Sequence, residues 1–157
     1  MIKKILVPLD GSELAESPLT YVGEFATALG VDQVNLVSVT ERVQGFRALD
    51  DPGAPSGQRL MPEGTGKMER QATKYLKKIA KGLEAKNIKV TTEVLLGDPA
   101  QEISIYANTR GCDLIIMASH GRSGPSKWAH GSVADRVLRA VCVPVMIIRA
   151  TGCTGNL

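Results

Sequence analysis

Five short apolar segments stand out along the chain. They are Ile5–Leu9, Val34–Val39, Val90–Leu96, Leu114–Met117 and Val143–Ile148. Most are rich in β-branched residues and nearly continuous, which is typical of parallel strands buried on both faces. Val90–Leu96 alternates more, because Thr92 interrupts it, and this pattern predicts an edge strand.

Segments with helical spacing lie between the apolar segments. The first has apolar residues at Ala15, Leu19, Val22, Ala26 and Leu29, and Gly30 supplies a C-terminal stop. Pro18 suits the first turn of this helix, so Ser12–Glu16 is expected to form a separate turn. The second helix carries the stripe Met68, Ala72, Tyr75, Leu76, Ile79 and Leu83.

Two further helices are indicated by their capping residues. Asp98 is a typical N-cap, and Pro99 follows it at the first helical position. Ser132 has the same role for a last helix that is expected to end near Ala140.

The order of elements therefore alternates between strand and helix from the first strand to the fifth. Alternation with buried strands predicts an α/β fold, a parallel doubly wound sheet with right-handed crossovers. Residues 1–150 are expected to form one domain, followed by a short tail at 151–157. Such sheets bind ligands at the carboxyl ends of their strands, where the strand order reverses.

Composition narrows the class of protein. The 157 residues include 19 Lys+Arg and 16 Asp+Glu, a net charge of +3 that is too mild to indicate nucleic-acid binding. No apolar segment approaches the roughly 18 residues of a membrane span. Cys112, Cys142 and Cys153 have no metal-binding or redox spacing, which predicts a reducing compartment, most simply the cytoplasm.

The segment Glu41–Gly66 separates the second strand from the second helix. It contains three prolines, Pro52, Pro55 and Pro62, together with several glycines. A connection of this length inside a compact domain is usually a lid, a binding loop or a disordered segment.

The strongest candidate for chemistry follows the fourth strand, from Ala118 to Ser132. Gly121 and Gly124 allow close backbone approach, and Gly131-Ser132 opens the last helix. Backbone amides at a helix start form an anion site, so this segment predicts phosphate binding. The alternative is that these glycines only turn the chain and that Ser132 only caps the helix.

Asp10-Gly11-Ser12 is the second candidate, because it follows the first strand directly. The Asp10 carboxylate could accept a hydrogen bond from a ribose hydroxyl or help to hold Mg²⁺ among phosphates. Alternatively, Asp10 or Ser12 only caps the following helix.

Catalytic motifs are lacking. Neither strand-to-helix connection reads GxxxxGK[ST], and no GxGxxG opens the first crossover. His120 and His130 are most simply loop histidines, and no nucleophile elbow accompanies them.

The combined motifs resemble those of the universal stress protein family. The resemblance is carried by Ile2–Ser12, Asp113–Gly124, Gly131–Ala134 and Val143–Ile148, and it covers essentially residues 2–149. The ATP-binding branch of that family carries glycine, two residues, glycine, nine residues, glycine and Ser/Thr. Gly121, Gly131 and Ser132 match this pattern, whereas its first glycine is replaced by Ala118.

The resemblance implies a Rossmann-like three-layer sandwich with strand order 3-2-1-4-5, and ATP with Mg²⁺ as the ligand. It implies that Pro8, Leu9, Asp10 and Val39 frame adenine and ribose, with Asp10 also at the metal. It further implies that the loop and the helix start contribute Ala118, Ser119, His120, Gly121, Arg122, Gly124, Gly131, Ser132 and Val133. The family also tends to dimerise through its last strand, here Val143–Ile148.

The leading hypothesis is therefore an ATP-binding regulatory protein of the stress response that forms a homodimer. One alternative is a dimeric interaction module that binds no nucleotide, which the alanine at position 118 favours. The other is a slow ATP hydrolase, although no catalytic base or nucleophile stands out.

Overall fold

The structure, a computed structural model, describes residues 1–40, 65–119 and 133–149. Strands and helices alternate along the described chain, as the sequence predicts. They are β1 (Lys4–Pro8), α1 (Glu13–Glu16), α2 (Leu19–Ala28), β2 (Gln33–Thr40), α3 (Thr65–Glu84), β3 (Val90–Leu96), α4 (Pro99–Thr109), β4 (Leu114–Ala118), α5 (Val133–Ala140) and β5 (Val145–Ile148).

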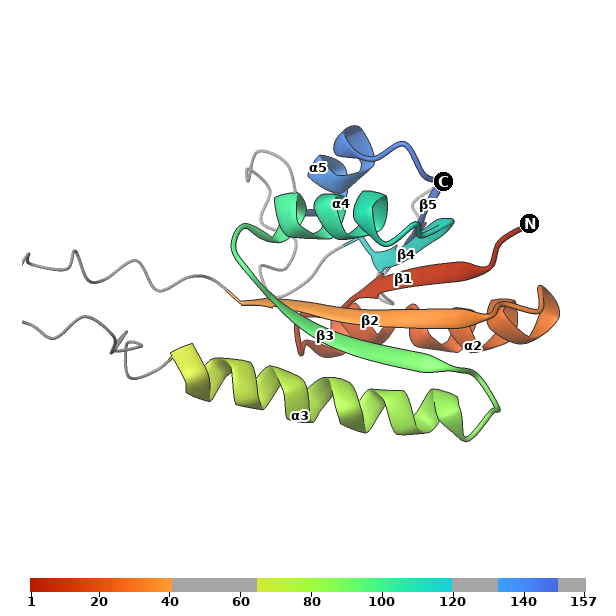
Figure 1. Cartoon of the computed structure of the whole chain (residues 1–157), viewed down its shortest axis with the longest axis horizontal. Helices are drawn as coiled ribbons and strands as arrows, with labels where there is room; N and C mark the ends of the chain where they lie inside the picture. Colours follow the sequence, from red (N-terminus) through yellow and green to blue (C-terminus); the bar gives the residue numbers. More distant parts are fainter. Residues whose placement is uncertain (41–64, 120–132, 150–157) are drawn as a thin grey trace, which may run out of the picture.

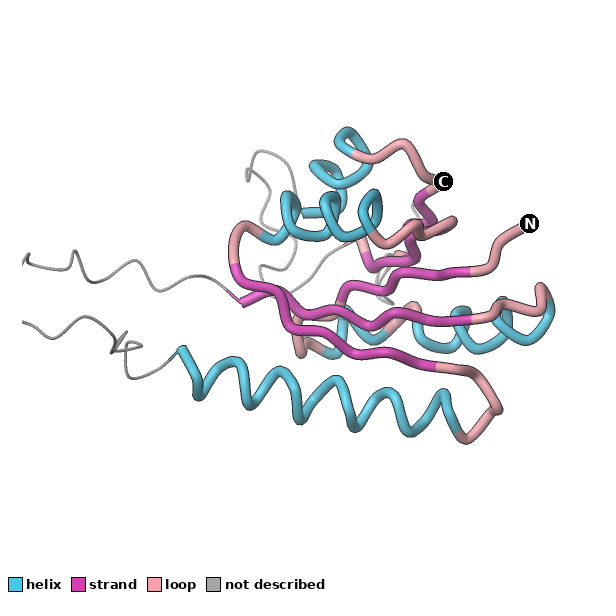
Figure 2. Tube along the Cα trace, viewed as in Figure 1, coloured by secondary structure: helices cyan, strands magenta, loops and turns pink. Residues whose placement is uncertain are grey.

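The five strands form one parallel sheet in the order β3-β2-β1-β4-β5, which confirms both the fold class and the strand order. Figure 2 shows the strands side by side, with the helices on either side of them. β3 lies at one edge, as its alternating pattern predicts, and β5 lies at the other.

Helices cover both faces of the sheet, so the molecule has three layers. Figure 1 shows α2 and α3 on one side of the strands and α4 and α5 on the other. Alternate residues of β1 serve the two cores: Ile5 and Val7 pack toward α1, α2 and α3, whereas Leu6 packs toward α4 and α5. Strands buried on both faces explain why the apolar segments are nearly continuous.

The predicted caps are confirmed where the structure describes them. The Ser12 side chain accepts from the backbone N–H of Ala15, 3.2 Å away, at the start of α1. The Asp98 carboxylate accepts from the N–H of Gln101 at 3.0 Å, and Pro99 occupies the first position of α4. Each cap satisfies one amide that the helix itself leaves without a partner.

Several predicted boundaries are wrong by one or two residues. β1 is Lys4–Pro8 rather than Ile5–Leu9, and β5 begins at Val145 rather than Val143. Pro144 has no N–H to give to a ladder, although its carbonyl accepts from Ile115. α1 is the separate turn expected at Ser12–Glu16, but Pro18 is the N-cap of α2 and not its first helical residue.

The predictions for the long connection and for the second helix are also partly wrong. Thr65 and Gly66 already belong to α3, so the segment predicted to end at Gly66 stops earlier. Met68, assigned to the buried stripe of this helix, is 44% exposed, while Leu76 is fully buried. The rest of the long connection, the residues 120–132 and the tail 151–157 lie outside the described residues.

Candidate functional site at the carboxyl ends of β1 and β4

The strand order reverses at β1, which has β2 on one side and β4 on the other. The β1–β2 ladder has five residue pairs, whereas the β1–β4 ladder comprises two, ending at Leu6 and Ile115. Beyond this point the backbone N–H of Leu9 bonds the Val37 carbonyl of β2 at 2.8 Å. β1 and β4 therefore reach their carboxyl ends without pairing, at the place where doubly wound sheets bind ligands.

Asp10 occupies the turn between β1 and α1. Its Oδ1 accepts hydrogen bonds from the backbone N–H of Ser12 at 2.9 Å and from the Ser12 hydroxyl at 2.6 Å. Gly11 between them has φ of +82°, a conformation that favours glycine. The capping role of this turn is thus confirmed, and a ligand role for Asp10 is an additional use of the same carboxylate.

The neighbouring residues of the predicted adenine side come from the ends of β1 and β2. Leu9 is 3% exposed, and Pro8 is the last residue of β1. Val39 lies one residue before the end of β2 and packs against the core on the α4 and α5 side. All three are thus placed at the carboxyl edge of the sheet: Pro8 and Leu9 come directly before Asp10, and Val39 is on β2, which pairs with β1.

The end of β4 leads into the predicted phosphate-binding segment. Ala118 pairs with Ile148 of β5, and the backbone N–H of Ser119 donates to the Ile148 carbonyl at 2.8 Å. The next predicted site residues lie outside the described residues, namely His120, Gly121, Arg122, Gly124, Gly131 and Ser132. Their predicted roles remain predictions.

The helix that follows that segment in the sequence, α5, begins at Val133. Arg136 in this helix bonds both carboxylate oxygens of Asp98, at 2.9 and 2.7 Å. This guanidinium, together with the Gln101 amide, lowers the pKa of Asp98. A bidentate pair fixes direction as well as distance, so the first turn of α5 is oriented by the N-terminus of α4.

A residue of α3 joins the polar groups near Asp10. The Tyr75 hydroxyl is buried and makes no hydrogen bond of ordinary geometry with a described residue. Burial, followed by the negative charges of Glu16 and Asp10, raises the pKa of Tyr75. Sequence reasoning missed this residue because its position fits the apolar stripe of the helix. The signal was the hydroxyl itself, which a phenylalanine would lack.

The described residues contain no group of three or more His, Cys, Asp or Glu side chains that could hold a metal ion. A Mg²⁺ bound with nucleotide usually needs only one or two carboxylates besides the phosphates, and the single carboxylate of Asp10 fits that donor set. Within the same part of the chain, no helix is long and apolar enough to cross a membrane.

The geometry defines a doubly wound α/β protein whose ligand site, if it follows the rule for such sheets, lies between β1 and β4. The chain belongs to the universal stress protein family, whose model matches residues 1–149.

Among its relatives is the universal stress protein MJ0577 of Methanocaldococcus jannaschii, 31% identical over 95% of this chain and 96% of that protein. The solved structure of MJ0577 superposes with a TM-score of 0.79 at 32% identity, covering 97% of this chain and 99% of the other.

Two more distant structures share the fold and were solved with nucleotides. A universal stress protein in complex with cAMP has a TM-score of 0.69 at 16% identity, covering 96% of this chain and 98% of its own. The universal stress protein of Archaeoglobus fulgidus in complex with dAMP has a TM-score of 0.61 at 18% identity, covering 94% of this chain and 98% of its own.

Proposed function

We propose that this protein binds an adenine nucleotide, ATP with Mg²⁺, between the carboxyl ends of β1 and β4, and that it acts as a nucleotide-dependent regulator of the stress response. The observation that carries the proposal is the end of β1–β4 pairing at Leu6 and Ile115, each four positions before Asp10 and Ser119, respectively. The two universal stress protein structures solved with cAMP and with dAMP support an adenine ligand.

The proposed roles follow the chemistry of each group. Pro8, Leu9 and Val39 offer apolar contact for the base, and the Asp10 carboxylate accepts from a ribose hydroxyl or holds Mg²⁺. The amides and the hydroxyl from Gly121 to Ser132, at the start of α5, bind phosphates. Bound Mg²⁺ would neutralise part of the phosphate charge.

Calorimetric titration of the whole protein with ATP, ADP, AMP and GTP, with and without Mg²⁺, tests this function. We expect heat with adenine nucleotides. Asp10→Asn should show a weaker Mg²⁺ requirement because it lacks the carboxylate charge that would hold the metal. The variant should keep the turn, since asparagine still accepts from Ser12. Gly131→Val should block phosphate approach, while its melting temperature shows whether the fold survives. Absence of heat with every adenine nucleotide would refute the proposal.

A second function, assembly through β5, rests on a separate observation. β5 is an edge strand whose described neighbour is β4, and Ile147 on it is 37% exposed. An isologous dimer would pair β5 antiparallel with its own copy. Ile147→Lys should weaken this dimer with little harm to the core, whereas Val145 is half-buried, packs against the core and is the poorer choice. A monomer of the unmodified protein in sedimentation at micromolar concentration would contradict it.

Regulation and location remain predictions. The proposed dimer would use the β5 edge of the sheet, whereas the proposed nucleotide site uses the carboxyl ends of β1 and β4, so nucleotide titration of Ile147→Lys tests whether the two are independent. A cytoplasmic location is expected from the scattered, unpaired cysteine pattern.

A further inference from the structure

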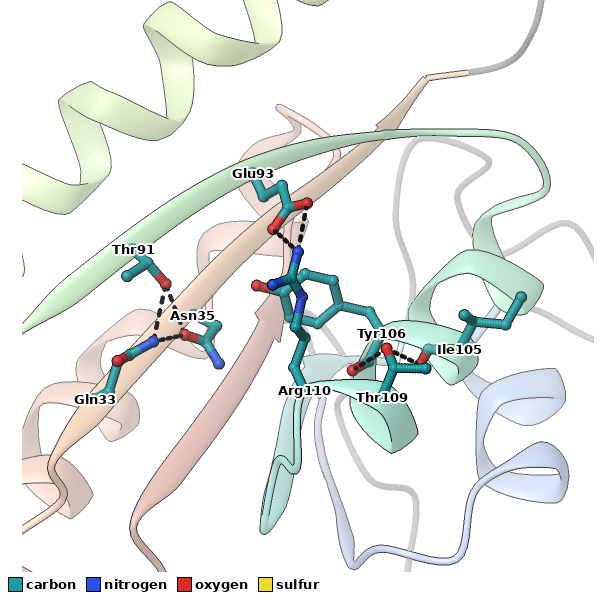
Figure 3. Close-up of polar contacts among 8 residues, drawn as sticks. All are labelled: Gln33, Asn35, Thr91, Glu93, Ile105, Tyr106, Thr109 and Arg110. Atoms are coloured by element: carbon teal, nitrogen blue, oxygen red, sulfur yellow. Dashed lines mark hydrogen bonds and ion pairs between the residues drawn. The ribbon is translucent and has the colours of Figure 1, made fainter.

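A polar cavity lies at the opposite end of the molecule from the proposed nucleotide site. It has a volume of about 230 Å³ and is built on the α4 side of the sheet, toward the amino ends of β2 and β3. Its lining, drawn in part in Figure 3, includes Gln33, Asn35, Thr91, Glu93, Tyr106 and Arg110. Every one of these side chains carries a hydrogen-bonding group.

The inner part of the cavity is a fixed set of amides and hydroxyls. Asn35 is 2% exposed, at a β2 position where the neighbouring residues are apolar. Its Oδ1 accepts from the Thr91 hydroxyl at 2.6 Å and from the Gln33 amide at 2.5 Å, as Figure 3 shows. Its Nδ2 donates to the Cys112 sulfur at 3.6 Å. A buried amide with these partners is held in one orientation, and it holds Gln33 and Thr91 in turn.

The outer part is charged and only partly self-neutralised. One nitrogen of Arg110, Nη2, reaches both carboxylate oxygens of Glu93, at 3.2 and 3.3 Å. This contact leaves Nη1 and Nε of the guanidinium outside it. Lys4 on β1 also lines the cavity and donates from Nζ to the Arg110 carbonyl at 3.2 Å. The charged lining residues are therefore two cations and one carboxylate, with the Asp113 carboxylate beside Lys4 outside the lining, so the free guanidinium nitrogens of Arg110 are the main attraction for an anionic ligand.

The Tyr106 ring, which lines the cavity, contacts the Arg110 side chain. The guanidinium carbon lies 5.5 Å from the centre of the Tyr106 ring, within the range of a cation–π contact. Burial and the charge of Glu93 raise the pKa of Tyr106 to about 12, so its hydroxyl stays protonated at neutral pH. Arg110 itself is 58% exposed and can be reached from solvent.

We propose that this cavity binds a small organic anion that carries a carboxylate. Arg110 and Lys4 hold the carboxylate, and Gln33 and Thr91 meet further polar groups of the ligand. The volume is below the roughly 300–1,000 Å³ of pockets for drug-sized molecules, so the ligand is small. A short dicarboxylate such as succinate has a suitable size and charge, and it serves as the probe.

The role of Glu93 gives the proposal its sharpest consequence. In the absence of ligand, Glu93 accepts hydrogen bonds from Nη2 of Arg110. The Glu93 carboxylate therefore competes with an incoming carboxylate for Arg110 and repels it. If the polar residues only form a solvated surface, neutralising Glu93 has no effect on succinate. If the cavity binds anions, Glu93→Gln tightens binding.

The experiment is a titration of the ¹⁵N-labelled whole protein with succinate at constant ionic strength, followed by the amide resonances of Thr91, Glu93 and Arg110. We expect saturable shifts with a dissociation constant on the order of 1 mM. Arg110→Gln should weaken binding about tenfold, and Arg110→Lys should not restore it, because lysine lacks the planar fork. Glu93→Gln should tighten it severalfold.

The succinate titration has three controls. Lys78→Gln removes an exposed cation from α3, on the other side of the sheet, and should leave succinate affinity unchanged. Succinamide, which has the same length without charge, should give no saturable shifts. Melting temperatures show that each variant is folded. The proposal is overturned if succinate gives no saturable shifts, if succinamide or chloride reproduces them, or if folded Arg110→Gln binds as well as the unmodified protein.

Discussion

The two ends of the parallel sheet use their polar residues differently. At the carboxyl ends, Asp10 bonds Ser12 two residues further along the chain, and Asp98 caps its own helix. At the amino ends, the bonds join elements that are far apart in sequence. Asp113, just before β4, accepts from the backbone N–H groups of Lys3 and Lys4 at the start of β1, both at 2.8 Å.

This difference follows from the direction of the chain. A strand that ends at the carboxyl edge passes directly into a helix start, where amides need nearby acceptors, so local caps suffice. At the amino edge no helix start follows the strand. There the Asp113 side chain, just before β4, bonds the backbone at the start of β1. Side-chain bonds from Asp113 thus join distant backbone at the amino end, whereas the carboxyl end uses local caps, with the Asp98–Arg136 pair as its long-range contact.

The largest effect is expected at the amino end, from Asp113→Ala. The substitution removes one acceptor from two backbone amides, those of Lys3 and Lys4, and bonds to a charged acceptor are worth more than neutral ones. We expect a loss of about 3 kcal/mol in the free energy of unfolding, measured by urea denaturation. A loss below about 0.5 kcal/mol would show that the two ends do not differ in this way.

The pH dependence of the same bond supplies a second measurement. The Lys3 and Lys4 amides, with the N-terminal amine nearby, hold the pKa of Asp113 below its usual range. A depressed folded-state pKa stabilises above the unfolded value of about 4 and loses this contribution as pH falls through the folded value. The stability difference between the unmodified protein and Asp113→Asn should therefore be largest at neutral pH and shrink on acidification. A constant difference would mean that charge is not involved.

The sequence alone predicted the order and type of the elements because these depend on local patterns. Continuous β-branched segments marked the strands, and Ser12 and Asp98 marked two helix starts. The strand order came from the resemblance to a family, not from periodicity. What local patterns could not show is which polar residues meet across the sheet, as Asn35 meets Thr91, 56 positions away.

For the candidate site, too, the sequence predicted residues that follow strands but not those that other elements bring close. Asp10 and Ser119 follow strands that were recognised from apolar segments, so their place at the carboxyl edge could be inferred. Tyr75 was missed because helical spacing treats a tyrosine as one more apolar residue, although its hydroxyl lies near the Asp10 turn. Arg136 was missed because its pairing with Asp98 depends on how two helices pack.

An intermediate effect is expected from the glycines that flank α4, one at each end of the sheet. Gly97 has φ of +151°, and a Cβ there would lie 2.7 Å from Oε1 of Glu102. Gly111 has φ of +62° and open space around the position of a Cβ. We expect Gly97→Ala to cost about 2 kcal/mol and Gly111→Ala about 1 kcal/mol, measured by urea denaturation.

Asparagine separates strain from crowding at these glycines. Gly111→Asn should cost less than Gly111→Ala, since asparagine tolerates the left-handed conformation better than other residues. Gly97→Asn should gain no such relief, because the φ of Gly97 lies well outside that region and Glu102 is close. Equal costs for the two asparagine variants would show that both ends of α4 are limited by backbone conformation alone.

The smallest effect is expected at the carboxyl end, from Asp98. Asp98→Ala removes the cap of α4 and the pair with Arg136, and loss of a cap costs about 1 kcal/mol. Asp98→Asn keeps a capping oxygen and loses only the pair, whose side chains are 48% and 40% exposed, so most of the stability should remain. Thermal unfolding of both variants at low and high salt measures the two contributions. If Asp98→Asn destabilises as much as Asp98→Ala, the ion pair with Arg136 and not the cap holds this end of α4.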